Sequence, residues 1–122
     1  MILVDASVWV DHLRRGDKTL VSLLTQGLVC THPMVIGELA CGNLQNRAEL
    51  ISLWQDLPFA IEAGYQEAMF FIESNKLMGK GIGYVDLHLL AATQLTSDTQ
   101  LWTRDKRLAT IAGALGIGFY TN

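Results

Sequence analysis

Four carboxylates, Asp5, Glu38, Asp86 and Asp105, stand at the edges of hydrophobic segments that are spread over almost the whole chain. A buried carboxylate without a partner is costly, so four such positions indicate a shared purpose. If the fold gathers them, they repel one another unless a cation neutralises them. Mg²⁺ and Mn²⁺ prefer oxygen ligands of this kind. The pattern therefore predicts a metal-dependent hydrolase.

The four acids differ in how easily a structural role explains them. Asp86 and Asp105 stand at the starts of predicted helices, where an Asp most often caps the helix. Asp5 resists that explanation, because Ser7 is the better cap for the helix that follows it. Glu38 is flanked by apolar residues on or beside a predicted buried face, where Glu is rarely found unpaired. Asp5 and Glu38 therefore favour a shared site.

Basic side chains flank the acids even though the net charge is -3. A negative chain is not typical of a simple nucleic-acid binder, but basic margins around an acidic centre can hold a polyanionic backbone. This layout is typical of a metal-dependent nuclease. The candidate RNA contacts are His12, Arg14, Arg15, Arg104, Lys106 and Arg107.

Short apolar runs alternate with helical patterns along the chain. Strands are predicted at residues 2–4, 28–30, 59–61, 100–103 and 118–120, and helices at 7–15, 18–26, 33–41, 46–54, 65–80, 86–94 and 106–115. Strands joined by helices predict an α/β fold whose mainly parallel sheet of four to five strands is covered on both faces. Ligands bind such folds outside the carboxyl ends of the strands. Asp5, Asp105 and Asp86, which begins a helix after a glycine loop, fit that location, and the longer side chain of Glu38 could reach it from a helix.

The bulk composition suits one domain over residues 1–122, with half of the residues hydrophobic and 17% charged. No apolar run is long enough to span a membrane, and the N-terminus lacks a signal-peptide pattern. Cys30 and Cys41 have no metal-binding spacing and suggest reduced packing residues. These observations predict a cytoplasmic protein.

Four segments resemble motifs of one family, the PIN-domain toxins of the VapC group in type II toxin–antitoxin systems. Residues 4–14 of this chain, VDASVWVDHLR, resemble the first motif of the family, and residues 36–39, IGEL, resemble the second. Residues 84–92, YVDLHLLAA, resemble the third motif, and residues 102–108, WTRDKRL, resemble the fourth. Each motif alone is weak, but the four together, in order and over nearly the full chain, are specific.

The resemblance implies a PIN fold, a three-layer α/β/α sandwich, and a Mg²⁺- or Mn²⁺-dependent endoribonuclease. It also implies that a VapB-type antitoxin silences the enzyme, and that the chain forms a homodimer and acts on RNA. The metal-binding and catalytic acids implied by the motifs are Asp5, Glu38, Asp86 and Asp105, supported through hydrogen bonds by Ser7 and Thr103. Within that set, Asp5 and Asp86 are expected to hold the metal, Glu38 to orient or deprotonate a water, and Asp105 to complete the shell.

The chain departs from the family pattern after the fourth motif. Lys106 and Arg107 stand where many members carry a further acid, which argues against a stable second metal site. The apolar surplus leads to another expectation. The predicted helix 65–80 carries apolar residues around much of its circumference, so part of it, or the 46–54 helix with Trp54, is expected to contact an antitoxin or a second protomer.

Three alternatives stay open at this point. The first is a PIN-domain nuclease of RNA processing or DNA cleavage that has no antitoxin. The second is a phosphoreceiver-like signalling module, which would need an acid pair after the first strand where this chain has Asp5 alone. The third is a PIN-like binding module that has lost catalysis, which the presence of all four acids disfavours.

Overall fold

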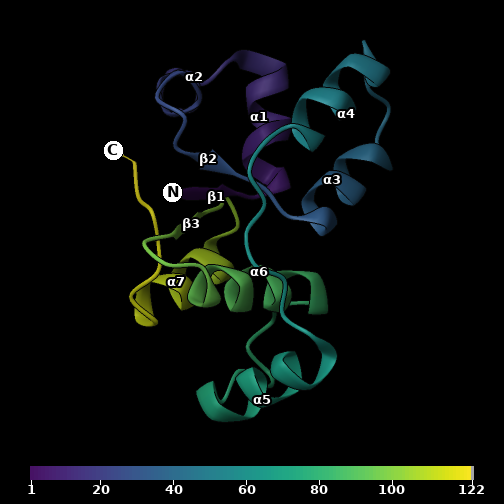
Figure 1. Cartoon of the computed structure of the whole chain (residues 1–122). Coiled ribbons are helices and arrows are strands. Elements are labelled where there is room, and N and C mark those ends of the chain that lie inside the picture. Colours follow the sequence, from purple (N-terminus) through teal and green to yellow (C-terminus); the bar gives the residue numbers. More distant parts are fainter. Residues whose placement is uncertain (122) are drawn as a thin grey trace.

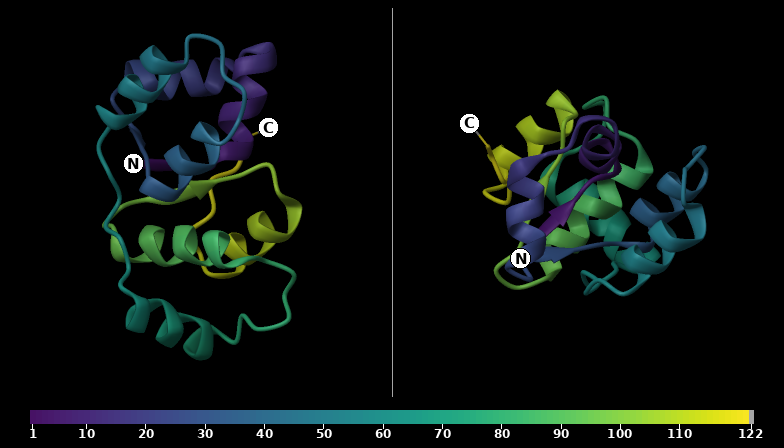
Figure 2. Two further views of the ribbon diagram at one scale, coloured as in Figure 1. Left: turned by 90° about the vertical axis from the view of Figure 1, so that its right-hand side faces the viewer. Right: turned by 90° about the horizontal axis from the view of Figure 1, so that it is seen from above.

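The computed structural model describes residues 1–121 and has three layers, with the sheet between two sets of helices (Figure 1). The strands are β1 (Ile2–Val4), β2 (Val29–Cys30) and β3 (Gln100–Trp102), and the helices are α1 (Ala6–Arg15), α2 (Lys18–Thr25), α3 (Pro33–Ala40), α4 (Arg47–Gln55), α5 (Tyr65–Asn75), α6 (Tyr84–Leu95) and α7 (Lys106–Ala114). Helices α1 to α4 lie on one side of the sheet, and α6 and α7 lie on the other (Figures 1 and 2). The predicted α/β/α architecture is confirmed.

The sheet is parallel, with the strand order β2-β1-β3. In the central strand β1, Leu3 is paired with Cys30 on one side and Leu101 on the other. Single parallel bridges at Phe59 and Gly118 extend the two edges by one residue each. The strands expected at 59–61 and 118–120 are thus reduced to single bridges within residues 1–121. Phe59 follows Pro58, which has no N–H to donate to a ladder.

The hydrophobic core extends from helices α1 to α4 through the sheet to α6. Leu3 and Val4 of β1 are fully buried, as are Leu89 and Leu90 of α6. Fully burying such a side chain contributes roughly 1.5–3 kcal/mol. This packing fixes the end of β1 and the start of α6, and with them the positions of two of the four acids.

Helix α5 differs from the helix expected over residues 65–80. It ends at Asn75, because Lys76 adopts a left-handed conformation (φ 52°) that terminates the helix. It packs against α6 on the side away from the sheet (Figure 2). Within α5, Ala68 is buried against the rest of the chain, whereas Tyr65 and Phe70 are exposed, so the expected contact of this helix with an antitoxin or a second protomer stays a prediction.

Trp54 also differs from its expected role as a contact residue. Its side chain is buried in the core of this chain and packs edge-on against Trp9, with ring centroids 5.8 Å apart. Leu53, its neighbour on α4, is the exposed residue instead. None of the helices within residues 1–121 has the length and apolar character that crossing a membrane requires.

Candidate active site

Asp5 lies at the junction between β1 and α1 and is almost fully buried. Its Oδ1 accepts a hydrogen bond from the backbone N–H of Ala6 at 2.8 Å, and its Oδ2 accepts one from Ser7 Oγ at 2.7 Å. The expectation that Ser7 caps α1 is wrong, because the helix begins at Ala6 and leaves Asp5 in the extended capping position. Asp5 therefore both caps the helix and presents its carboxylate at the carboxyl end of the sheet.

The segment after β3 is tied to the same carboxylate. Thr103 Oγ1 donates to Asp5 Oδ2 at 2.8 Å and accepts a hydrogen bond from the backbone N–H of Asp105 at 3.1 Å. Ser7 Oγ accepts a hydrogen bond from the backbone N–H of Arg104 at 3.0 Å. Ser7 and Thr103 thus link the ends of two neighbouring parallel strands through one acid, as a pair of supporting hydroxyls would.

Asp105 caps α7, because its Oδ1 accepts a hydrogen bond from the backbone N–H of Leu108 at 3.0 Å. Asp86 lies in the first turn of α6 rather than at its first residue, since the helix starts at Tyr84. There it accepts a long hydrogen bond of 3.4 Å from the backbone N–H of Gly83. Capping and a site role are compatible for both acids, because each keeps oxygen lone pairs free for another ligand.

Glu38 projects from α3 on its outward side. Val35, Ile36 and Leu39 face the core, whereas Glu38 is exposed and lines a cavity of about 720 Å³ between α1, α3 and α4. Glu38 therefore lies beside the buried face of α3 and not on it, which is one of the two expected alternatives. Val35, three residues earlier, and Leu39, the next residue, are its neighbours at the edge of that buried face.

The pKa values of Glu38 and Asp86 show that the acids share one electrostatic environment. The pKa of Glu38 is raised, first by partial screening of its carboxyl group from water and then by the nearby charges of Asp5 and Asp86. The pKa of Asp86 is also raised, first by desolvation, with the Gly83 N–H opposing and Asp5 and Asp105 adding to the shift. Like charges that disfavour one another's ionisation lie close together.

The donor set suits a hard divalent cation, because it consists of carboxylate oxygens whose mutual repulsion a cation would relieve. Within residues 1–121, however, no three His, Cys, Asp or Glu side chains are close enough to form a preassembled metal site. The acids are within electrostatic reach of one another but remain separate. Only Asp5, held by three donors, is already fixed in orientation.

The candidate RNA contacts fall into two groups. Arg15 is paired with Asp11, and Arg104 is paired with Asp17 at 2.6 Å while lying over the Trp102 ring. His12 accepts a hydrogen bond from the Asp17 backbone N–H through Nδ1, which is a structural role at the end of α1. The candidates that stay exposed without a carboxylate partner within residues 1–121 are Arg14, Lys106 and Arg107.

Sequence reasoning missed two features of this region. Asp11 and Asp17 neutralise cations beside the site, and the i,i+4 spacing of Asp11 and Arg15 was the available signal. Lys80 lies in the glycine-rich loop before Asp86 and shares a cavity with Arg107. No spacing rule connects these two residues, because they come from different parts of the chain.

Comparison with known proteins defines the class of this fold and site. The family model described as PIN domain matches residues 2–114. Ribonuclease VapC32 from two strains of Mycobacterium tuberculosis is 39% identical over 117 residues, which cover 96% of this chain and 94% of that protein. The chain therefore belongs to the PIN domain family, in its VapC group.

Proposed function

We propose that the chain is a metal-dependent endoribonuclease that hydrolyses RNA phosphodiester bonds and serves as the toxin of a VapBC-type toxin–antitoxin pair. The observation that carries the proposal is the hydrogen-bonded link from Asp5 at the end of β1 through Thr103 to the start of α7 at Asp105. The raised pKa values of Glu38 and Asp86, to which Asp5 contributes in both cases, support it. The name ribonuclease of the 39% identical relatives supports the same activity.

The surroundings of the four acids indicate two roles, binding of the cation and acceptance of a proton. Asp5 and Asp86 would hold Mg²⁺ or Mn²⁺, and Asp105 would offer a further carboxylate from the start of α7. When bound, the cation supplies positive charge that lowers the pKa of water and stabilises charge developing on the phosphate. Glu38 accepts a proton from the attacking water at its carboxylate, a role that a raised pKa favours.

Ser7 and Thr103 keep Asp5 ready for this task. Both hydroxyls donate to Asp5 Oδ2, at 2.7 and 2.8 Å, so the carboxylate cannot rotate freely about the Cβ–Cγ bond. Groups that orient a metal ligand in this way often affect metal affinity as strongly as a weak ligand does. The two hydroxyls are therefore positioning residues.

The exposed apolar side chains of α5 suit the proposed partners. Tyr65, Met69 and Phe70 are exposed on one helix that packs against α6, and Phe70 lines a cavity between the two helices. Exposed apolar residues gathered on one element mark protein contacts. We propose that the chain acts in the cytoplasm, where it forms a homodimer and is held inactive by a VapB-type antitoxin that covers exposed apolar surface.

A cleavage assay tests the activity. Purified wild-type protein is expected to cut single-stranded RNA with Mg²⁺ or Mn²⁺ and to stop when EDTA is added. Asp86→Asn is expected to lower the rate by several orders of magnitude and to relieve growth arrest on induction in cells. Lys18→Ala, an exposed side chain on helix α2 that makes no ion pair with the four acids within residues 1–121, serves as the matched control. Cleavage that persists in EDTA, or at the wild-type rate in Asp86→Asn, would contradict the proposal.

A further inference from the structure

The Lys and Arg side chains of this chain fall into two groups, those paired with a carboxylate or a backbone carbonyl and those without a carboxylate partner. Arg15 and Arg104 form ion pairs with the acids of the α1–α2 region, and Arg47 donates to the backbone carbonyls of Gly42 and Ala40. The other Lys and Arg side chains have no carboxylate partner within residues 1–121. A polyanion binds most readily where cations are not already neutralised.

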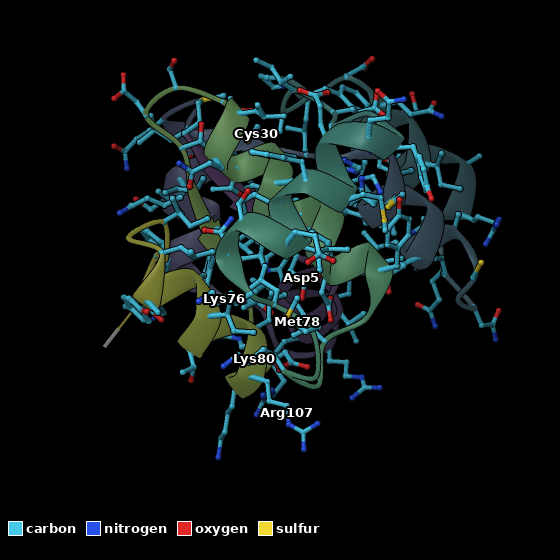
Figure 3. All side chains as sticks on the ribbon, turned by 90° about the horizontal axis from the view of Figure 1, so that it is seen from below. Asp5, Cys30, Lys76, Met78, Lys80 and Arg107 are labelled. Carbon is cyan, nitrogen blue, oxygen red and sulfur yellow. The ribbon has the colours of Figure 1, made fainter. Side chains whose placement is uncertain are left out.

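Three of the free cations line one cavity of about 470 Å³ between α7 and the loop that follows α5. We call this cavity the basic groove, and its side chains divide into a charged rim and an apolar floor. The rim consists of Lys80, Lys106 and Arg107, and the floor of Leu77, Ile111 and Leu115. Lys80 and Arg107 lie on the same face of the molecule, with Lys76 nearby in the view of Figure 3.

The groove begins next to the acids. Lys106 and Arg107 are the first two residues of α7, directly after Asp105. Arg107 also contacts the loop before Asp86, because a Cβ built on Gly81 would lie 2.7 Å from Arg107 Nη1. Gly81 has a φ of 80°, which suits glycine, and its lack of a side chain leaves room for the guanidinium. Arg107 thus spans the two elements that carry Asp86 and Asp105.

The opposite side of the site is less suited to a phosphate backbone. The cavity there is lined by Arg14, but also by Glu38 and Glu49. Asp11 and Asp17 neutralise the two nearest guanidinium groups. An RNA strand that reaches the acids therefore meets net positive charge on the α7 side and mixed or negative charge on the α1 side.

We propose that the basic groove binds one nucleotide of the RNA substrate beside the bond that is cut, with its phosphate at Lys80 and Arg107 and its base against the apolar floor. The inference rests on the proposed function and specifies where that site holds its substrate. A volume of about 470 Å³ falls within the usual range for small-ligand pockets. Asn75 and Thr110 also line the groove, but their side-chain donors are held by the backbone carbonyls of Phe71 and Lys106, so we expect the contact to discriminate weakly among bases.

A binding experiment tests the charged rim. A fluorescent single-stranded RNA of mixed sequence is titrated with the full-length protein in EDTA, so that no cleavage occurs, over a range of salt concentrations. Lys80→Ala and Arg107→Ala are each expected to weaken binding and to reduce the slope of log K against log salt by about 0.7 for each lost phosphate contact. Lys18→Ala, also exposed, is the matched control and should leave the slope unchanged.

A second variant tests the apolar floor. Ala114 is exposed and lines the same groove, so Ala114→Leu fills it without altering charge. We expect weaker binding of the RNA, an unchanged salt slope, and unchanged binding of an abasic ribose-phosphate chain of equal length. An equal loss for both probes would overturn the assignment of the base to this floor.

The outcomes separate this inference from the proposed function. If the salt slope of Lys80→Ala and Arg107→Ala matches that of the wild type, the groove does not hold the backbone, whatever the cleavage assay shows. If the wild type fails to cleave but the groove variants bind RNA with reduced slopes, the proposed activity fails and the binding site stands. Melting temperatures close to that of the wild type verify that each variant is folded.

Discussion

Thr103 Oγ1 donates a hydrogen bond of 2.8 Å to Asp5 Oδ2, although the two residues lie 98 positions apart in the chain. Ser7 Oγ donates to the same oxygen from within α1. One carboxylate oxygen therefore receives a donor from each of two neighbouring strand ends. This relationship makes the orientation of Asp5 depend on the β1–β3 pairing and not on local structure alone.

Removing one of these donors should weaken cation binding before it affects the fold. Thr103→Val keeps the shape of the side chain but loses the hydroxyl, so Asp5 is less well oriented. We expect the Kd for Mn²⁺, measured by calorimetry, to rise by roughly tenfold or more. Thr103→Ser should restore most of the affinity, and failure of that rescue would assign the effect to packing instead.

Arg104 should matter for stability more than for RNA binding. Its guanidinium is paired with Asp17, contacts Asp11 at 3.4 Å and lies 5.4 Å from the centroid of the Trp102 ring. Because Arg104 is partly exposed, we expect Arg104→Ala to cost about 1 kcal/mol or less of unfolding free energy in urea. The salt slope of RNA binding should stay at the wild-type value, and a reduced slope would instead support Arg104 as an RNA contact.

The raised pKa of Glu38 predicts a pH-dependent stability. The folded chain binds this proton more tightly than the unfolded chain, so the unfolding free energy falls as pH rises from the ordinary Glu value through the folded value. Glu38→Gln removes that penalty. In EDTA the variant should melt at a higher temperature than the wild type at about pH 8, and at nearly the same temperature at about pH 4.

Cation binding should also change the thermal stability of the chain. Mg²⁺ or Mn²⁺ should raise the melting temperature of the wild type at neutral pH, because it binds the folded chain and relieves repulsion among the acids. Melting curves of Asp86→Asn should show a smaller rise at the same cation concentration. An equal rise in both proteins would place cation binding elsewhere.

Helix α5 should contribute to assembly. Phe70 is 73% exposed, so Phe70→Ser removes apolar surface without opening the core. We expect sedimentation or light scattering to show a shift from dimer toward monomer, or co-purification with a VapB-type partner to weaken. Val21→Ser on α2, which is 50% exposed and lies outside both helices expected to make contacts, is the matched control. If neither assembly changes, another surface makes these contacts.

Much of the fold was predictable because hydrophobic patterns and turn signals are local. Strands β1, β2 and β3 and most helix positions follow from short apolar runs and 3.6-residue periodicity. The end of α5 was less predictable, because Lys76 adopts a left-handed conformation that its residue type does not announce. The strand length at Phe59 depends on its neighbours at the sheet edge, which the sequence does not specify.

By itself, the sequence determined the residues of the candidate site: four acids at the edges of apolar segments, two hydroxyls implied by the family resemblance, and the order of the segments that carry them. Only the tertiary structure decided which of these groups contact one another and which stay exposed. Pairing of β1 with β3 brought Thr103 to Asp5. Packing of α3 against α1 and α4 left Glu38 exposed, and an ion pair with Asp17 engaged Arg104, whereas Arg107 has no carboxylate partner within residues 1–121. Such choices depend on contacts between residues distant in the chain, and neither spacing nor composition encodes them directly.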